Sequence, residues 1–253
     1  MTPPASLLDV LDARTGVVCA VGAGGKKTLL RHLAHQHGGR VALTATSMTP
    51  PFPPELDFDV VIEAPGRLAA ALAARTGARR LAYACPSDRP DRLAGVPRDL
   101  IADIHSQAGF EATYVKADGA RMRWIKAPED DEPMLPAGCR QVIAIVSARA
   151  IGEPLGPRVA HRVERLQSVM ALAPGEPITP VHVGRLIASP VGLSKCPDGY
   201  RISPVINMVD DARLEALART AAQAALEAAP AIEQVVLTCL HRPGNPLVAV
   251  VRR

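Results

Sequence analysis

Short runs of β-branched and apolar residues alternate with amphipathic stretches along most of the chain. Helices are expected around residues 29–34 and 214–226, where apolar positions recur at helical spacing. The runs expected as strands are 17–21, 41–44, 60–62, 81–84, 113–117, 142–146, 205–207 and 235–240. Because alternation of strand and helix favours parallel strand pairing, the pattern predicts an α/β fold with a mainly parallel sheet and helices on both faces.

The domain organisation is expected to be simple. One domain accounts for residues 1–253, and residues 171–200 are the candidate for an inserted subdomain. The run at 247–251 follows a Pro-Gly-Asn-Pro turn at 243–246, which predicts an antiparallel strand at the edge of the sheet.

Composition narrows the classes of function. The chain has 29 Lys and Arg against 25 Asp and Glu, a mildly basic balance that suits an anionic ligand. It has only three Tyr, three Phe and one Trp, too few for the stacking platform of a single-strand nucleic-acid binder. The five cysteines are scattered and form no CxxC pair, so we expect reduced thiols and no zinc site. No apolar run approaches the roughly 20 residues that span a bilayer, and no secretion signal is recognisable, so a cytoplasmic location is expected.

The strongest local signal is VVCAVGAGGKKTLLRHLA at residues 17–34, an apolar strand that runs into glycines, two lysines and an amphipathic helix. Glycines let backbone N–H groups point at an anion, the helix N-terminus adds its positive dipole end, and a lysine reaches the phosphates. The alternative is an ordinary glycine-rich turn with solvent-exposed lysines. The residues predicted to bind phosphate are Gly22, Ala23, Gly24, Gly25, Lys26, Lys27 and Thr28.

This segment departs from the P-loop pattern GxxxxGK[ST]. Aligning Gly25 and Lys26 with its GK places Ala20 at the first glycine and Lys27 at the hydroxyl residue that binds magnesium. Thr28 follows directly, but a shift of one residue on a helix turns a side chain by about 100°. The sequence leaves open whether Thr28 restores the metal ligand.

A second candidate is Asp118, which follows the predicted strand at 113–117 and precedes Gly119. The carboxyl ends of strands are where open α/β sheets bind ligands. Together with the glycine segment, this position predicts magnesium binding by Asp118, directly or through water. The alternative is that Asp118 caps the turn after its strand.

A third candidate is the strand that ends in Asn207-Met208-Val209-Asp210. In NKxD motifs the carboxylate accepts from the N–H groups of a guanine while the amide braces the loop, and Met208 stands here in place of the lysine. The alternative is that Asp210 is the N-cap of a helix that begins near Ala212.

Together these residues resemble the YqeC family, P-loop accessory proteins of selenium-dependent molybdenum hydroxylases. The middle segment is the most specific, because ADG followed by KAP and EP is not explained by general P-loop design. The family usually reads closer to GAGGKTT, TTTT and EADGSR, so Lys27, Ala45 and Lys116 are departures. The resembling segments are VGAGGKKT at 21–28, TATSMTPP at 44–51, KADGARMRWIKAPEDDEPMLP at 116–136, GEPLGPRVAHRVE at 152–164 and INMVD at 206–210.

The resemblance implies a P-loop NTPase-like fold and a cytoplasmic protein that binds ATP or GTP. By this analogy Lys26 contacts the phosphates, and Thr28 or Asp118 binds Mg²⁺. Thr44 and Thr46 orient water or the γ-phosphate. The implied function is maturation of, or cofactor insertion into, a molybdenum hydroxylase.

Two functions stay open. One is an NTPase with slow or altered hydrolysis, because positive charges at Lys27 and Lys116 disfavour a divalent cation. The other is a non-hydrolysing scaffold that binds a molybdenum cofactor intermediate or the partner hydroxylase. A homodimer is compatible with either, and neither nucleic acid nor a membrane is expected as a partner.

Overall fold

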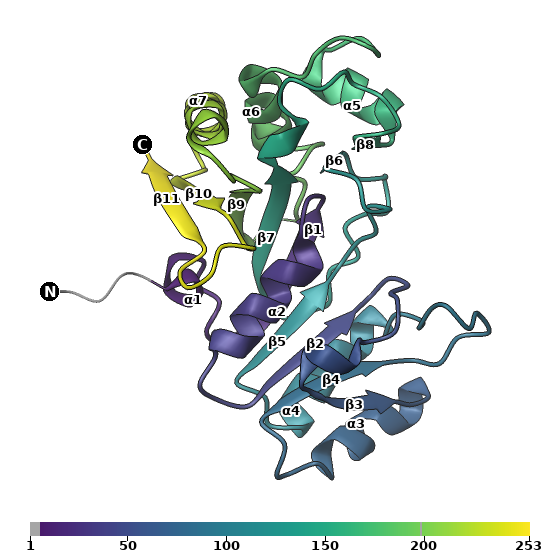
Figure 1. Cartoon of the computed structure of the whole chain (residues 1–253). Helices are drawn as coiled ribbons and strands as arrows, with labels where there is room; N and C mark the ends of the chain where they lie inside the picture. Colours follow the sequence, from purple (N-terminus) through teal and green to yellow (C-terminus); the bar gives the residue numbers. More distant parts are fainter. Residues whose placement is uncertain (1–5, 198) are drawn as a thin grey trace, which may run out of the picture.

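The computed structural model describes residues 6–197 and 199–253 (Figure 1). In this part of the chain, nine strands form one sheet in the order β11-β10-β9-β7-β1-β5-β2-β4-β3. All neighbouring pairs are parallel except β10 and β11. The nine strands are β1 (Gly16–Gly22), β2 (Val41–Ala45), β3 (Asp59–Ile62), β4 (Arg80–Ala84), β5 (Ala112–Lys116), β7 (Cys139–Ser147), β9 (Arg201–Asn207), β10 (Gln234–Thr238) and β11 (Leu247–Arg252). The mainly parallel sheet and the antiparallel strand at its edge are therefore confirmed.

Helices cover both faces of the sheet. Those found among the described residues are α1 (Leu7–Val10), α2 (Lys26–Gln36), α3 (Pro65–Ala73), α4 (Ile101–Gln107), α5 (Val163–Met170), α6 (Pro180–Ala188) and α7 (Ala212–Ala228). The apolar side chains of α1 and α2 share one core layer with alternate residues of β1, while those of α3 to α7 form the layer on the opposite face. Figure 1 shows α2 lying across the central strands. This arrangement confirms the predicted α/β fold of the P-loop NTPase-like type.

Two consecutive helices, α5 and α6, belong to the long connection from β7 to β9. Residues 171–200 contain α6, which packs against α7. A short parallel pair, β6 (Ile125–Lys126) and β8 (Ala160–His161), lies near the carboxyl end of β7 (Figure 1). Whether residues 171–200 form a subdomain stays a prediction.

The carboxyl ends of four neighbouring strands meet at one edge of the sheet. Ala20 of β1 pairs with Lys116 of β5, and Ser147 of β7 pairs with Asn207 of β9. Gly22 ends β1 between these pairs. Parallel strands bring their ends to the same edge, so Gly24 and Asn207, which are 183 residues apart in the chain, become neighbours here.

No helix among residues 6–197 and 199–253 is both long enough and apolar enough to cross a membrane.

Candidate functional site

The turn from β1 to α2 has three residues, Ala23, Gly24 and Gly25. Ala20 lies inside β1, three residues before this turn begins. The turn is thus shorter than the eight-residue P-loop pattern requires, and the first glycine of that pattern falls on a strand residue. This explains the mismatch at Ala20.

Both glycines of this three-residue turn are required by close packing. Gly24 has φ +93°, and a Cβ atom there would lie 2.7 Å from the main-chain nitrogen of Ser147. Gly25 has φ +125°, and a Cβ atom there would lie 2.5 Å from Nδ2 of Asn207. Since a side chain at either position would be both strained and obstructed, the turn can only follow this path with glycine.

A row of backbone N–H groups at the start of α2 is free of hydrogen bonds within the described residues. The first hydrogen bond of the helix runs from Leu29 N–H to Gly25 O at 2.9 Å. The N–H groups of residues 24–28 donate to no partner among the described residues. Five consecutive free donors at a helix N-terminus, with the positive end of the helix dipole behind them, form an anion-binding arrangement.

Asn207 holds this turn in place. Its Nδ2 donates to Gly24 O at 2.8 Å, and its Oδ1 accepts from Thr238 Oγ1 at 2.9 Å and from Leu240 N–H at 3.4 Å. The Asn207 side chain is fully buried. Its amide therefore braces the glycine turn, as expected for the amide of an NxxD motif.

Asp210 is directed elsewhere. Its carboxylate pairs with Arg149 at 2.6 Å, on the half-exposed surface after β7. The N-cap of α7 is Asp211, whose side chain accepts from Leu214 N–H at 2.7 Å. The alternative that made Asp210 the helix cap is therefore wrong by one residue. Base recognition by Asp210 stays a prediction.

Lys26, the first residue of α2, forms a buried ion pair with Asp118. Its Nζ lies 2.9 Å from Asp118 Oδ1 and donates to Gly22 O. Both side chains are almost completely buried, at 6% and 3% exposure. Burial lowers the pKa of Lys26, and the charge of Asp118 opposes this effect. Asp118 and the glycine turn are thus brought together, as the sequence predicted.

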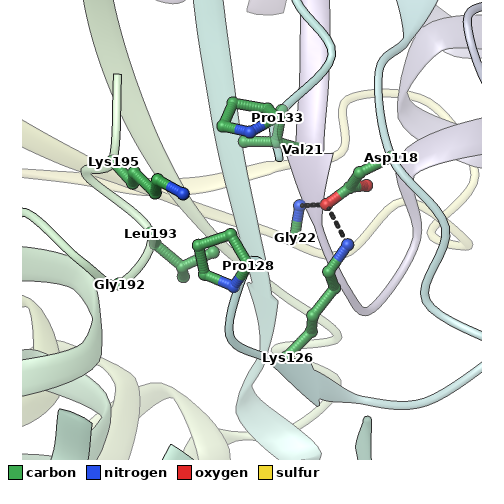
Figure 2. Close-up of a pocket in the computed structure, with 9 residues that line it drawn as sticks. All are labelled: Val21, Gly22, Asp118, Lys126, Pro128, Pro133, Gly192, Leu193 and Lys195. Carbon is green, nitrogen blue, oxygen red and sulfur yellow. Dashed lines mark hydrogen bonds and ion pairs between the residues drawn. The ribbon is translucent and has the colours of Figure 1, made fainter. Parts of the chain in front are cut away.

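Lys126 holds the other side of the same carboxylate. Asp118 Oδ2 accepts from Lys126 Nζ at 2.7 Å and from Gly22 N–H at 2.8 Å (Figure 2). Lys126 Nζ also contacts Gly119 O at 2.7 Å and Glu132 Oε2 at 2.7 Å. With no exposed side-chain surface, Lys126 uses all three of its donors on acceptors inside the protein.

Glu132 extends this network toward the start of α5. Its carboxylate accepts from Arg162 at 2.5 and 3.1 Å as well as from Lys126. Burial of Glu132 raises its pKa, but the hydrogen bonds from Arg162 and Lys126 outweigh that effect and hold the pKa at about 2. Arg162 therefore fixes the 129–132 segment and is part of a buried network rather than a solvent-exposed helix face.

Lys116 approaches the site from the end of β5. Its Nζ donates to Ser47 Oγ at 2.6 Å and to Met48 O at 3.0 Å. Burial, followed by the positive charge of Lys26, lowers the pKa of Lys116 to about 8. Nearby, the hydroxyl of Thr46 is buried and has no hydrogen-bond partner among the described residues. Lys116 and Thr46 thus place further donors at the edge that carries the glycine turn.

Thr44 lies on the opposite face of the sheet from α2. Its backbone pairs with Val115, which belongs to the core layer under α3 to α7. Its hydroxyl donates to Tyr83 O at 2.8 Å. Thr44 therefore links β2 to β4, and the structure does not bring it to the glycine turn. Of the two residues that follow Lys26, Lys27 is exposed and Thr28 is half-buried.

A family model described as YqeC protein matches residues 18–164, more than half of the chain. The chain belongs to the YqeC family. It is 28% identical over 204 residues to "Uncharacterized protein YqeC" of Escherichia coli (strain K12), which covers 79% of this chain and 78% of that protein. No solved structure matches the chain.

The YqeC match contains most of the site. It begins in β1 and ends just after Arg162, so it includes the glycine turn, Asp118, Lys126 and Glu132. Asn207 lies outside the matched range. The family segment thus carries the charged network, while the brace on the turn comes from the later part of the chain.

A divalent cation does not fit the YqeC site as these side chains are arranged. Mg²⁺ needs an octahedral set of oxygen ligands. Asp118 Oδ2 already accepts two hydrogen bonds. Asp118 Oδ1 accepts no hydrogen bond from the described residues, but it forms an ion pair with Lys26 Nζ at 2.9 Å. A cation at Oδ1 would have to displace one ammonium group and remain beside another. Among the residues described here, no group of three or more His, Cys, Asp or Glu side chains could hold a metal ion.

A small cavity lies beside Asp118 and Lys126, bordered by Pro128, Pro133 and Lys195 (Figure 2). Its volume of about 10 Å³ holds about one water molecule. Lys195 Nζ donates to the carbonyl groups of residues 129 and 130 at 2.5 and 2.8 Å. The space on this side of Asp118 is therefore too small for a ligand larger than water.

Sequence reasoning missed the role of Lys126. It stands eight residues after Asp118 and is not among the residues that the sequence motifs predict to bind phosphate or metal. The available signal was its position in the run WIKAP, where apolar neighbours on both sides indicate a buried strand. A lysine buried in such a strand requires an acid partner, and Asp118 and Glu132 are two of the five acids inside the same specific segment.

Proposed function

We propose that this YqeC protein binds a nucleoside triphosphate at the glycine turn. The observation that carries the proposal is the row of free N–H groups at residues 24–28, beside a lysine that is buried at the start of the same helix. Free backbone N–H donors with a lysine ammonium group beside them are what a phosphate chain requires. Lys26 can exchange its contact with Gly22 O for a phosphate oxygen without leaving the site, since only its flexible side chain must move.

The biological role that we propose is that of an accessory protein in the maturation of a molybdenum hydroxylase or the insertion of its cofactor. This role rests on the family resemblance. Hydrolysis is proposed to be slow, because Lys27 occupies the position of the magnesium-binding hydroxyl residue and Lys126 occupies Asp118. The same observation favours a second function, that of a scaffold that binds a molybdenum cofactor intermediate or the hydroxylase without turnover.

Calorimetric titration with ATP and GTP tests the binding step. Wild-type protein should bind at least one of them, and Lys26→Ala should lower the affinity by about 100-fold, the loss of one charge-assisted contact. Lys195→Met is the matched control, since among the described residues Lys195 Nζ donates to the main-chain carbonyl groups of residues 129 and 130 and not to Asp118. Fluorescence of Trp124, the single tryptophan, follows binding independently. Equal affinities for wild type and Lys26→Ala would refute the assigned site.

Two further measurements separate the candidate functions. Phosphate release by wild type and by Lys27→Thr shows whether a hydroxyl residue at position 27 increases hydrolysis. Loading of molybdenum into a purified apo-hydroxylase, with and without the chain and nucleotide, tests the accessory role. Loading that is independent of the chain would reject that role and leave nucleotide binding as a separate result.

A further inference from the structure

Four of the five lysines of the chain lie together at the edge of the sheet that carries the glycine turn. Lys26, Lys116 and Lys126 lie around Asp118, and Lys27 is the next residue along α2. The fifth, Lys195, donates instead to the main-chain carbonyl groups of residues 129 and 130. The other 24 basic residues of the 29 are arginines. Lysine differs from arginine in being a compact point charge with three donors, so it can occupy a position that would suit a small cation.

The charges at this edge are strongly unbalanced. The positive charges of three neighbouring lysines lower the pKa of Lys116, and the negative charge of Asp118 raises it. The three are Lys26, Lys27 and Lys126. Glu132, the next acid, is already paired with Arg162 as well as with Lys126. The edge therefore has excess positive charge before any ligand arrives.

Lys126 neutralises Asp118 in the way that a bound metal would. In metal-dependent phosphate sites, a carboxylate after the neighbouring strand holds Mg²⁺, which offsets the negative charge of the phosphates. Here the carboxylate after β5 holds an ammonium group at 2.7 Å. Because Lys126 is fully buried and its three donors are occupied by acceptors of the protein, the fold itself fixes this ammonium group beside Asp118.

We propose that the glycine turn binds the free polyphosphate of its nucleotide rather than the magnesium complex, with Lys126 as the built-in replacement for the metal ion. This inference rests on the proposed nucleotide binding. A nucleoside triphosphate carries more negative charge without Mg²⁺, and a site with several ammonium groups and one neutralised carboxylate binds the more highly charged species better. Magnesium competes by removing that species from solution.

The test is calorimetric titration of wild-type protein with ATP and GTP, once in EDTA and once in excess MgCl₂. Ionic strength is kept constant with NaCl, because surface charge effects are screened by salt. The inference expects binding in EDTA, weakened by about tenfold or more in excess magnesium. Binding that requires magnesium would overturn the inference and leave the proposed nucleotide binding intact. Absence of binding in both conditions would overturn both.

The variant Lys126→Met identifies the residue responsible. Without its ammonium group, Asp118 keeps an uncompensated charge on this side, so affinity in EDTA should fall by about tenfold or more and added magnesium should restore it. Lys195→Met is the control and should keep the wild-type response to magnesium. If Lys126→Met responds to magnesium like wild type, Lys126 is not the replacement for the metal. Should this variant fail to fold, the two wild-type titrations still decide whether the free polyphosphate is the ligand.

Discussion

Replacing Glu132 with Gln isolates the ionic part of the buried network. Glu132 is 13% exposed, and hydrogen bonds from Arg162 and Lys126 hold its pKa at about 2 against an ordinary 4.5. This difference corresponds to about 3 kcal/mol of stability at pH 7. Because the folded-state pKa is lowered, the contribution is fully present above pH 4.5 and disappears as the pH falls through 2. At pH 3, about 2 kcal/mol of it should already be lost.

The assay is urea unfolding at pH 7 and pH 3. Wild type should lose about 2 kcal/mol more than Glu132→Gln between the two pH values, since the variant has no carboxylate to protonate. Glu129→Gln is the matched control: Glu129 also pairs with Arg162 but is 39% exposed, so its removal should cost under about 1 kcal/mol. Equal acid sensitivity of wild type and Glu132→Gln would refute the attribution of this stability to Glu132.

Three other substitutions test the local geometry. Gly25→Ala places a Cβ atom against Asn207, so it should cost about 1–3 kcal/mol and weaken nucleotide binding; unchanged urea stability and affinity would contradict the steric argument. Asp211→Ala should cost about 1 kcal/mol through loss of the α7 cap, while Asp210→Ala should cost under about 0.5 kcal/mol; the reverse order in thermal unfolding would restore Asp210 as the cap. Tyr114→Phe removes a buried hydroxyl that donates at 2.9 Å to a main-chain carbonyl near the N-terminal helix, with an expected cost of about 1 kcal/mol by urea unfolding. A cost near zero would show that this hydrogen bond adds nothing net.

Most of the fold was predictable from local sequence pattern. Strands such as β1 and β7 are buried on both faces and therefore read as continuous apolar runs, and α2 and α7 show helical spacing of apolar residues. The turn at 243–246 predicted the antiparallel pairing of β11 with β10. These features depend on neighbours in the chain, so one sequence is enough to recognise them.

The candidate site was predictable mainly where its residues lie close together in the chain. The glycine turn and Lys26 form one contiguous segment, and its strand-to-helix context was correctly recognised. The NxxD pattern predicted that the Asn207 amide braces a loop, and the structure identifies that loop as the glycine turn. The function of Asp118 was predicted from its strand position and the glycine segment, without its two lysine partners.

The sequence by itself determined that a glycine-rich turn joins the first strand to a helix in an α/β protein, and its resemblance to the YqeC family was carried by contiguous motifs. Only the tertiary structure decided what Asp118 binds. The strand order places β5 beside β1, which brings Asp118 to the glycine turn. The chain then forms the β6–β8 pair, in which Lys126 lies beside the Asp118 carboxylate. The electrostatics of a buried carboxylate depend on which charges lie within a few ångströms, and that distance is set by how strands pair and not by separation along the chain.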